Sequence, residues 1–252
     1  MVTTTLSKVP KLGGAVKQLN DSTWPEFLLY GDVRGWSSLY TVFAEFQVVF
    51  AEDERLIAAG LTVPCCWDPS LPVPQTIDEV VWEARWPLTT ARGVLCAMAA
   101  LVAPDCRGRG LSRQLVKSMV ELARRHGLMG VLVPVRPIHK HKFPNEQMEA
   151  YCARRNAEGS TYDPWLRVHE QLGGTYLGIG EATLTVRGTI AEWQEWTGQK
   201  FNRSGEYVVV EALTPVVIDI EAGIGTYREP NVWYFHSAVE PNLTRTRDSL
   251  RA

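Results

Sequence analysis

The residues best suited to bind a charged ligand lie in one short turn, residues 103–110. Its sequence is Ala-Pro-Asp-Cys-Arg-Gly-Arg-Gly, in which two arginines alternate with two glycines. Glycines let the backbone approach a ligand closely, and a helix that starts near Leu111 would offer unpaired N–H groups and the positive end of its dipole. The turn is therefore a candidate phosphate site, to which Arg107 and Arg109 add charge. An ordinary strand-to-helix turn with two solvated arginines is an equally simple interpretation.

The spacing in this turn does not fit two common phosphate-binding loops. A P-loop needs Gly-Lys followed by Ser or Thr, and no such sequence follows Gly110. A dinucleotide-binding G-x-G-x-x-G needs a third glycine, but Arg113 stands at that position.

The elements on either side of the turn form one supersecondary unit. Residues 94–102 are aliphatic or alanine except for Cys96, which predicts a strand that is buried on both faces. A helix is predicted from Leu111 because apolar residues recur at helical spacing, and Gly127 stands where its C-terminal cap belongs. Residues 131–135 are a second buried strand. Strand, turn, helix and strand predict a right-handed βαβ unit.

The turn resembles the pyrophosphate loop of the GNAT acyltransferase superfamily, R/Q-x-x-G-x-G/A. The matching residues are Arg107, Gly108, Arg109, Gly110, Leu111 and Ser112, and Ser112 stands where glycine or alanine is usual. The resemblance implies that these six residues hold the pyrophosphate of an acyl-CoA. It also implies that the two parallel strands splay apart, and that the backbone of Leu101 and Val102 contacts the pantetheine and thioester in the gap.

A histidine further along the chain is the candidate acid or base. Many GNAT enzymes carry an acidic tyrosine in a helix that ends Tyr-x-x-Leu-Gly-Phe, and this chain has His169-Glu-Gln-Leu-Gly-Gly in the same register. An imidazole titrates near neutral pH and can serve as acid or base. The alternative is a histidine that is merely hydrogen-bonded on a helix face.

Residues 162–169 also resemble a narrower branch, the bacterial GNAT-like proteins of secondary metabolism and the GNAT-like loading domains of polyketide synthases. That branch implies decarboxylation of a malonyl-type thioester or acyl transfer to a carrier protein. Arg136, Lys140 and Lys142 would then be candidates to hold a carboxylate, although all three are also expected as solvated charges.

Composition limits the classes of partner. The chain has 252 residues and a formal net charge of −2, so no global field favours nucleic acid or an anionic membrane. No run of eighteen apolar residues and no signal peptide is present. Five cysteines without a C-x-x-C motif favour reduced thiols in a cytoplasm. His139 and His141 lie in a basic loop without neighbouring cysteine or carboxylate, so no metal is expected there.

We expect an α/β fold with a mixed α+β sheet, which is the GNAT acyl-CoA-binding fold with central splayed parallel strands and a β-rich C-terminal extension. Residues 1–20 are expected to be a loosely ordered lead-in and residues 237–252 a polar tail. Between them, residues 21–236 form a single domain, with an acyl-CoA-binding core at about 40–180 and the extension at 181–236.

The function that this resemblance implies is N-acyl transfer, with acetyl-CoA as donor and a small-molecule amine as acceptor in a ternary complex. The alternatives keep the fold: a malonyl-CoA decarboxylase, an S-acyltransferase to an acyl carrier protein, or a non-catalytic acyl-CoA-binding module. The acceptor pocket is expected around residues 24–40, 82–86 and 137–161. An aromatic pocket would suit an apolar or aromatic acceptor. The sequence does not indicate the acceptor or the oligomeric state.

Overall fold

The fold is known from a computed structural model, which describes residues 1–88 and 93–239. One mixed sheet runs through it in the order β1-β2-β3-β4-β5-β9-β8-β7, and β6 pairs with β9 beside this path. The strands are β1 (Val2–Thr5), β2 (Val48–Glu52), β3 (Arg55–Cys66), β4 (Gly93–Val102), β5 (Gly130–Val135), β6 (Thr175–Thr189), β7 (Gly205–Tyr207), β8 (Val216–Asp219) and β9 (Ile224–Ser237). Of the described pairings, only β4 with β5 is parallel. The predicted mixed sheet is confirmed.

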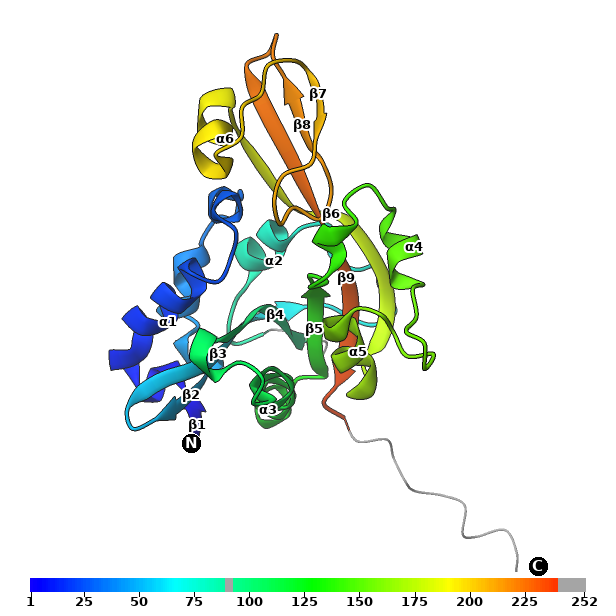
Figure 1. Ribbon diagram of the computed structural model, residues 1–252. Helices are drawn as coiled ribbons and strands as arrows, with labels where there is room; N and C mark the ends of the chain where they lie inside the picture. Colours follow the sequence, from blue (N-terminus) through cyan, green and yellow to red (C-terminus); the bar gives the residue numbers. More distant parts are fainter. Residues whose placement is uncertain (89–92, 240–252) are drawn as a thin grey trace, which may run out of the picture.

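The predicted βαβ unit lies at the centre of this sheet (Figure 1). It consists of β4, helix α3 (Leu111–Arg125) and β5, with bounds close to those predicted. Both strands are almost wholly buried because α3 packs against β3, β4 and β5, while helix α1 (Gly13–Asp21) contacts β3 and β4. Burial on both faces explains why the two strands are continuous apolar runs in the sequence.

The N-terminal stretch is more regular than its sequence indicates. Residues 1–20, expected to be a loosely ordered lead-in, hold β1 and nearly all of α1. Strand β1 adds an edge to the sheet by pairing with β2, and Val16 and Leu19 of α1 join the main core. Asp21 ends α1, whereas two short 3₁₀ helices follow at Glu26–Tyr30 and Trp36–Tyr40. Both segments contribute residues to one wall of the candidate site.

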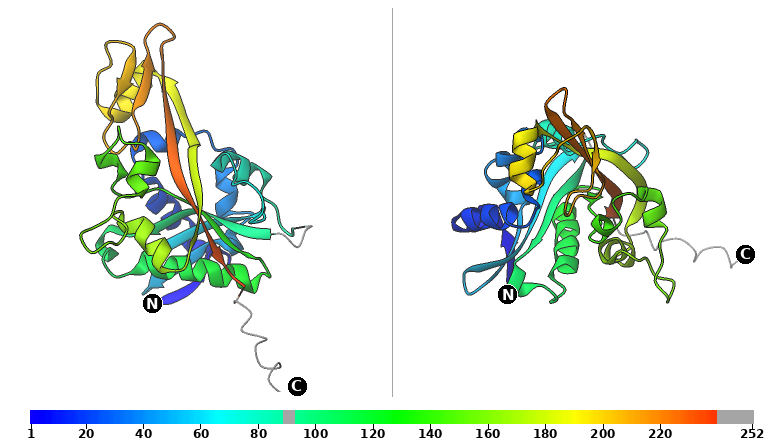
Figure 2. Two further views of the ribbon diagram at one scale, coloured as in Figure 1. Left: turned by 90° about the vertical axis from the view of Figure 1, so that its right-hand side faces the viewer. Right: turned by 45° about the horizontal axis from the view of Figure 1, so that its top comes forward.

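The C-terminal extension rises from the body as an arm, made by the upper halves of β6 and β9, by β7 and β8, and by helix α6 (Ile190–Thr197) (Figure 1 and left panel of Figure 2). Strand β6 is long, and its pairing with β9 is interrupted by two bulges. The arm has its own core, which includes Trp193, Phe201 and Tyr227.

Two of the remaining helices begin at side-chain caps. Helix α2 (Ile77–Glu83) starts with a capping box of Thr76 and Glu79, and helix α5 (Pro164–Gln171) starts where the Asp163 carboxylate accepts from the N–H groups of Trp165 and Leu166. Helix α4 (Met148–Cys152) is short and has no side-chain cap. Residues 240–252 of the predicted polar tail lie outside the described residues.

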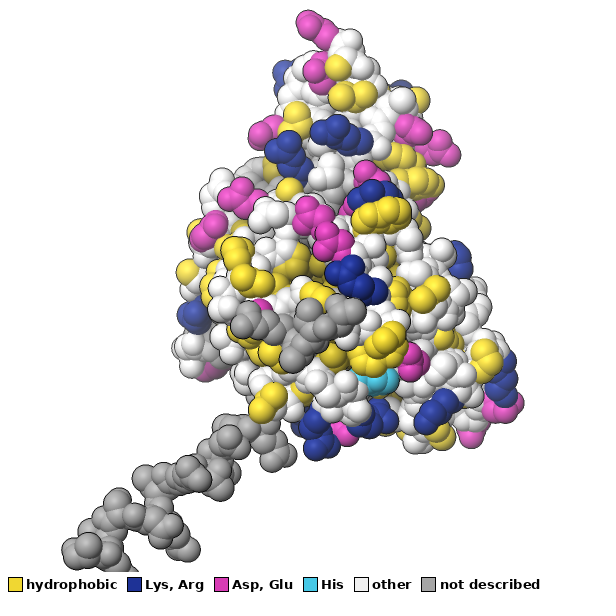
Figure 3. Space-filling view, turned by 180° about the vertical axis from the view of Figure 1, so that it is seen from behind, with side chains coloured by type: hydrophobic (Ala, Val, Ile, Leu, Met, Phe, Trp, Pro, Cys, Tyr) yellow, Lys and Arg dark blue, Asp and Glu magenta, His cyan; other side chains and the backbone are white. Residues whose placement is uncertain are grey.

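The surface mixes the two signs of charge. Seen from behind, hydrophobic side chains gather between the arm and the body, among scattered acidic and basic ones (Figure 3). Within residues 1–88 and 93–239, no helix has the length and apolar character needed to span a bilayer.

Candidate acyl-CoA and acceptor site

The glycine turn has the backbone that an anion site needs. Gly108 and Gly110 have φ values of 79° and 72°, in the left-handed region that favours glycine. A Cβ built at either position would meet nothing within 4 Å, so the turn is open towards solvent. The glycines are therefore required by the backbone conformation and not by crowding.

The first turn of α3 presents unbonded donors beside these glycines. Gly110 is the N-cap residue and supplies no side-chain cap, and the first bond of the helix runs from Gln114 N to Gly110 O, at 3.2 Å. The N–H groups of Leu111, Ser112 and Arg113 thus have no described backbone partner and lie at the positive end of a 15-residue helix. This arrangement suits a phosphate.

The two arginines of the turn are not equivalent. Arg107 is exposed and has no ion pair within the described part of the chain. Arg109 is committed to the carboxylate of Glu52 on β2, with Nη2 2.6 Å from Oε1. This contact lowers the pKa of Glu52 because the guanidinium hydrogen-bonds to its carboxylate. Arg107 is therefore the cation that is free for an anionic ligand.

The parallel strands β4 and β5 separate on the side of the sheet where β4 leads into this turn. They pair only at Leu95 with Val131 and at Cys96 with Leu132, so the rest of β4 has no strand partner on its β5 side in the described residues. Leu101 is fully buried and Val102 half-buried on this unpaired stretch. Their other edge pairs with Ala59 and Ala58 of β3. The predicted splay is confirmed.

A bulge in β4 lies where the strands begin to separate. Leu61 of β3 pairs with Ala99 and Thr62 pairs with Ala97, which leaves Met98 as the extra residue. A bulge redirects a side chain, and Met98 lines a cavity of about 440 Å³. Pro134 of β5 also lines it, so this cavity meets both splayed strands.

The cavity is walled by elements that are far apart in the sequence. α1, the two 3₁₀ helices and the start of α2 supply one side, and β6 and β9 supply the other. Residues 24–36 of the expected acceptor region do line it, whereas residues 82–86 and 137–161 do not. Part of the last stretch, Pro144–Glu149, instead lines a separate and more open groove of about 790 Å³ beside the arm.

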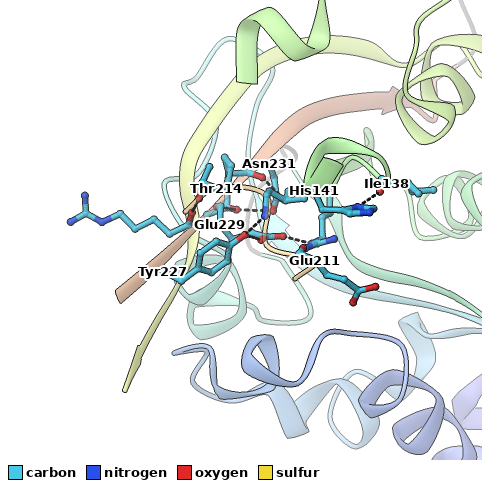
Figure 4. A network of polar contacts seen from close by, with 12 residues as sticks. Ile138, His141, Glu211, Thr214, Tyr227, Glu229 and Asn231 are labelled. Carbon is cyan, nitrogen blue, oxygen red and sulfur yellow. Dashed lines mark hydrogen bonds and ion pairs between the residues drawn. The ribbon is translucent and has the colours of Figure 1, made fainter. Parts of the chain in front are cut away.

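The floor of the cavity carries a buried polar network (Figure 4). The carboxylate of Glu229 accepts from Arg136 Nε at 2.5 Å and from the hydroxyl of Tyr227. Arg136 also donates through Nη2 to the backbone oxygen of Glu211, at 2.5 Å. Asn231 accepts from Thr183 Oγ1 at 2.6 Å. Arg136, Glu229 and Asn231 all line the cavity, and their bonds to one another and to the arm hold its floor in place.

The other two cations suggested for a carboxylate lie elsewhere. Lys140 is fully buried, and its ammonium donates to the backbone oxygens of Phe143 and Leu213, both at 2.7 Å. Burial lowers its pKa. Lys142 is part of the same short 3₁₀ helix and does not line the cavity. Of the three cations, only Arg136 reaches this site.

His169 is fully buried on α5, and it is not a lining residue of the cavity. Its Nδ1 lies 2.8 Å from Nε2 of His236 on β9, and its ring packs edge-on against Trp165, with centroids 4.4 Å apart. Its Nε2 has no hydrogen-bond partner. Burial, with a smaller effect of His236, lowers the pKa of His169 to about 3, so the ring is neutral at neutral pH. The lowered pKa of His169 therefore differs from the titration near neutral pH that its residue type led us to expect.

Comparison with known proteins agrees with this geometry. The sequence profile of the Acetyltransferase (GNAT) family matches residues 19–141. The arginine N-acetyltransferase avaD of Aspergillus versicolor is 27% identical over 248 residues, which covers 85% of each chain. Residues 19–141 are thus similar to the GNAT acetyltransferase family, and both matches support an acyltransferase.

Two solved structures share the fold of this chain. The loading GNATL domain of CurA from Lyngbya majuscula superposes with a TM-score of 0.61 at 14% identity, over 91% of this chain and 94% of that one. GphF, a GNAT-like decarboxylase in complex with isobutyryl-CoA, gives a TM-score of 0.57 at 17% identity, over 91% and 96%. At these identities the likeness concerns the fold, and it includes the arm because the coverage is nearly complete.

The residues present at this site fit coenzyme A. An open glycine turn, three unbonded N–H groups and a free Arg107 suit a diphosphate, while the unpaired edge of β4 suits an extended amide-bearing chain. Within residues 1–88 and 93–239, no three His, Cys, Asp or Glu side chains are grouped to hold a metal ion.

Sequence reasoning missed the floor of the acceptor cavity. Glu229 and Asn231 belong to a stretch for which no role was predicted, and Tyr227 was not considered. A signal was present, since Glu229 and Asn231 lie on either side of Pro230, directly before the apolar run Val232–Phe235. Polar groups that are buried in a sheet need partners, and those partners come from β5 and β6, distant in the sequence.

Proposed function

We propose that this protein transfers the acetyl group of acetyl-CoA to the nitrogen of a small-molecule amine, by direct attack in a ternary complex. One observation carries the proposal. The gap between β4 and β5 opens at the anion-binding turn, and the strands on its two sides, through Met98 and Pro134, also line the 440 Å³ cavity. A donor in the gap and an acceptor in the cavity would therefore meet at the bulge of β4.

The turn and the first strand are proposed to hold the cofactor. The N–H groups of Leu111 and Ser112, the backbone of Gly108 and Gly110 and the guanidinium of Arg107 would bind its diphosphate. Arg109 contributes through its pair with Glu52, which braces the turn against β2. Leu101 and Val102 would flank the pantetheine. Bound there, acetyl-CoA would supply an acetyl group that is activated as a thioester.

His169 is proposed as the group that stabilises the leaving sulfur. Because its pKa is lowered to about 3, the ring acts as a neutral hydrogen-bond donor and not as an imidazolium. If His236 donates to Nδ1, the proton of His169 is on Nε2, the atom that has no partner in the structure. His169 is fully buried, so this role requires α5 to shift when the cofactor binds.

The acceptor is proposed to be an amine that fits the cavity. The relative avaD is named for arginine, which makes arginine the first acceptor to test. A cavity of about 440 Å³ is within the usual range of roughly 300–1,000 Å³ for small-molecule sites. A cytoplasmic location stays a prediction.

A second candidate function has one observation in its favour. Arg136 lines the cavity with its side chain 17% exposed, and its guanidinium would meet the carboxylate of malonyl-CoA if that carboxylate displaced Glu229. This arrangement would suit decarboxylation of malonyl-CoA, or acyl transfer to the thiol of a carrier protein.

Mass spectrometry separates the two candidates. Purified protein is incubated with acetyl-CoA or malonyl-CoA, each with and without an amine mixture that includes arginine. The proposal expects acetylated amine and free CoA only when acetyl-CoA and amine are both present, and much less of both in the His169→Ala variant. Conversion of malonyl-CoA to acetyl-CoA without amine, lost in the same variant, would replace N-acetylation by the second candidate.

A further inference from the structure

We infer that the acceptor is an amine with an apolar, aromatic body and without a free carboxylate. This inference rests on the proposed function, since it names the substrate class of the same cavity. Two features of the lining carry it: a rigid aromatic wall and a set of charges that compensate one another.

The aromatic wall comes from the N-terminal segments. Trp24, Tyr30 and Trp36 all line the cavity. The indole N–H of Trp24 donates to Asn20 Oδ1 at 3.2 Å, and that of Trp36 donates to Tyr40 Oη at 3.3 Å. Since these polar tips are already bonded within the wall, what the two indoles offer to a ligand is apolar ring surface.

The arm fixes this wall in place. The ring of Tyr30 stacks on Trp196 of α6, with centroids 4.4 Å apart and planes 13° from parallel. Gly31 forms a β-bridge with Val186, and Phe27 belongs to the core of the arm. A wall that is held from behind loses little conformational freedom when a flat ligand packs on it, which favours aromatic ligands.

The charged side chains of the lining cancel in pairs. Arg136 is bonded to Glu229, with Nε 2.5 Å from Oε1, and Lys17 forms an ion pair with Asp21. These four are the charged residues among the lining residues. A ligand carboxylate at the floor would therefore face a guanidinium whose charge Glu229 already compensates. It would lose water without gaining a free counter-charge, which is unfavourable.

Two matched pairs of amines test the inference by isothermal titration calorimetry. Tryptophan and tryptophanamide differ in the carboxylate charge, and n-butylamine and tryptamine differ in the aromatic body. We expect each second member to bind about tenfold more tightly, since burying an aromatic group or sparing an unpaired charge is worth on the order of 1.4 kcal/mol. Arginine and argininamide repeat the first comparison on the acceptor for which avaD is named.

Substitutions in the aromatic wall test whether the wall causes the tighter binding of tryptamine. Trp24→Ala should remove most of the gain of tryptamine over n-butylamine and leave the carboxylate comparison unchanged, while Trp24→Phe should retain the gain. Trp82→Ala is the matched control because Trp82 is 61% exposed and does not line the cavity. Equal affinities within each pair of amines, or tighter binding of the carboxylates, would overturn the inference even if no variant folds.

The titrations and the mass spectrometry together distinguish this inference from the proposed function. If the amines bind in the expected order but no acetylated amine forms with acetyl-CoA, the preference of the cavity for aromatic amines stands and the proposed acetyl transfer fails. If amines are acetylated without regard to ring or carboxylate, the transfer stands and the inference is wrong.

Discussion

Arg107 and Arg109 stand two residues apart in the turn, yet only Arg107 is without an ion pair in the described structure. Arg107→Ala should raise the Kd for coenzyme A by about tenfold to a hundredfold, the usual cost of losing a charged hydrogen bond. Arg109→Ala should raise it less, because the Arg109 guanidinium is already bonded to Glu52. Calorimetry measures both, with Arg125→Ala at the far end of α3 as control. Equal losses for Arg107 and Arg109 would contradict the assignment.

Gly110 tests the backbone of the turn. At φ 72° an alanine adopts a left-handed conformation, so Gly110→Ala should lower the free energy of unfolding by roughly 1–2 kcal/mol. Coenzyme A should also bind more weakly. Gly13→Ala is the control: Gly13 has φ −56° and an open surface, so alanine there should stabilise by about 0.5–1 kcal/mol. Urea unfolding measures both changes. If Gly110→Ala left the free energy of unfolding unchanged, the backbone of the turn would not require a glycine.

The buried histidine pair predicts a pH dependence of stability. The pKa values of His169 and His236 are lowered to about 3 and about 4, mainly by burial, so the unfolded chain binds more protons than the folded one at mildly acidic pH. The stabilisation is complete above pH of about 6.5 and is lost as the pH falls towards these values, by up to roughly 1.4 kcal/mol per pH unit for each group. His236→Gln should make the slope of unfolding free energy between pH 6 and 4.5 shallower. An unchanged slope would mean that other groups control it.

At the scale of elements, the arm and the acceptor wall act together. Trp196→Ala removes the ring that supports Tyr30, so we expect the KM for the amine to rise about tenfold while the Kd of coenzyme A stays the same, as loss of one well-packed aromatic contact implies. Val210→Ser is a control, since Val210 is 82% exposed. A parallel loss of both affinities would indicate general unfolding instead of a displaced wall.

The elements that sequence reasoning predicted well are those whose signals are local. The apolar runs of β4 and β5, the helical spacing of α3 and the glycine that follows it depend on neighbouring residues. The Arg136–Glu229 contact joins residues 93 positions apart, and the pairing of β9 with β5 joins residues that are even more distant, which no short pattern encodes. For the same reason the turn could be predicted, whereas only the part of the cavity at residues 24–36 could be.

At the scale of the whole molecule, the proposed donor and acceptor sites have different origins. The proposed donor site is one continuous βαβ unit, residues 93–135, whereas the cavity is assembled from the N-terminal helices and the C-terminal arm. This division predicts that a substitution in one site can weaken the binding of its ligand and leave the affinity for the other ligand unchanged. His169 lies on α5, which contacts α3 through Arg113 and Gln171, and this link connects the histidine to the donor side.

The central claim is that coenzyme A occupies the turn and the gap between β4 and β5. Hydrogen–deuterium exchange of the protein with and without saturating acetyl-CoA tests it most directly. The account predicts slower exchange in peptides that cover residues 99–102 and 108–113, with little change in residues 205–220 of the arm. Unchanged exchange in both of these segments, with protection elsewhere, would contradict it.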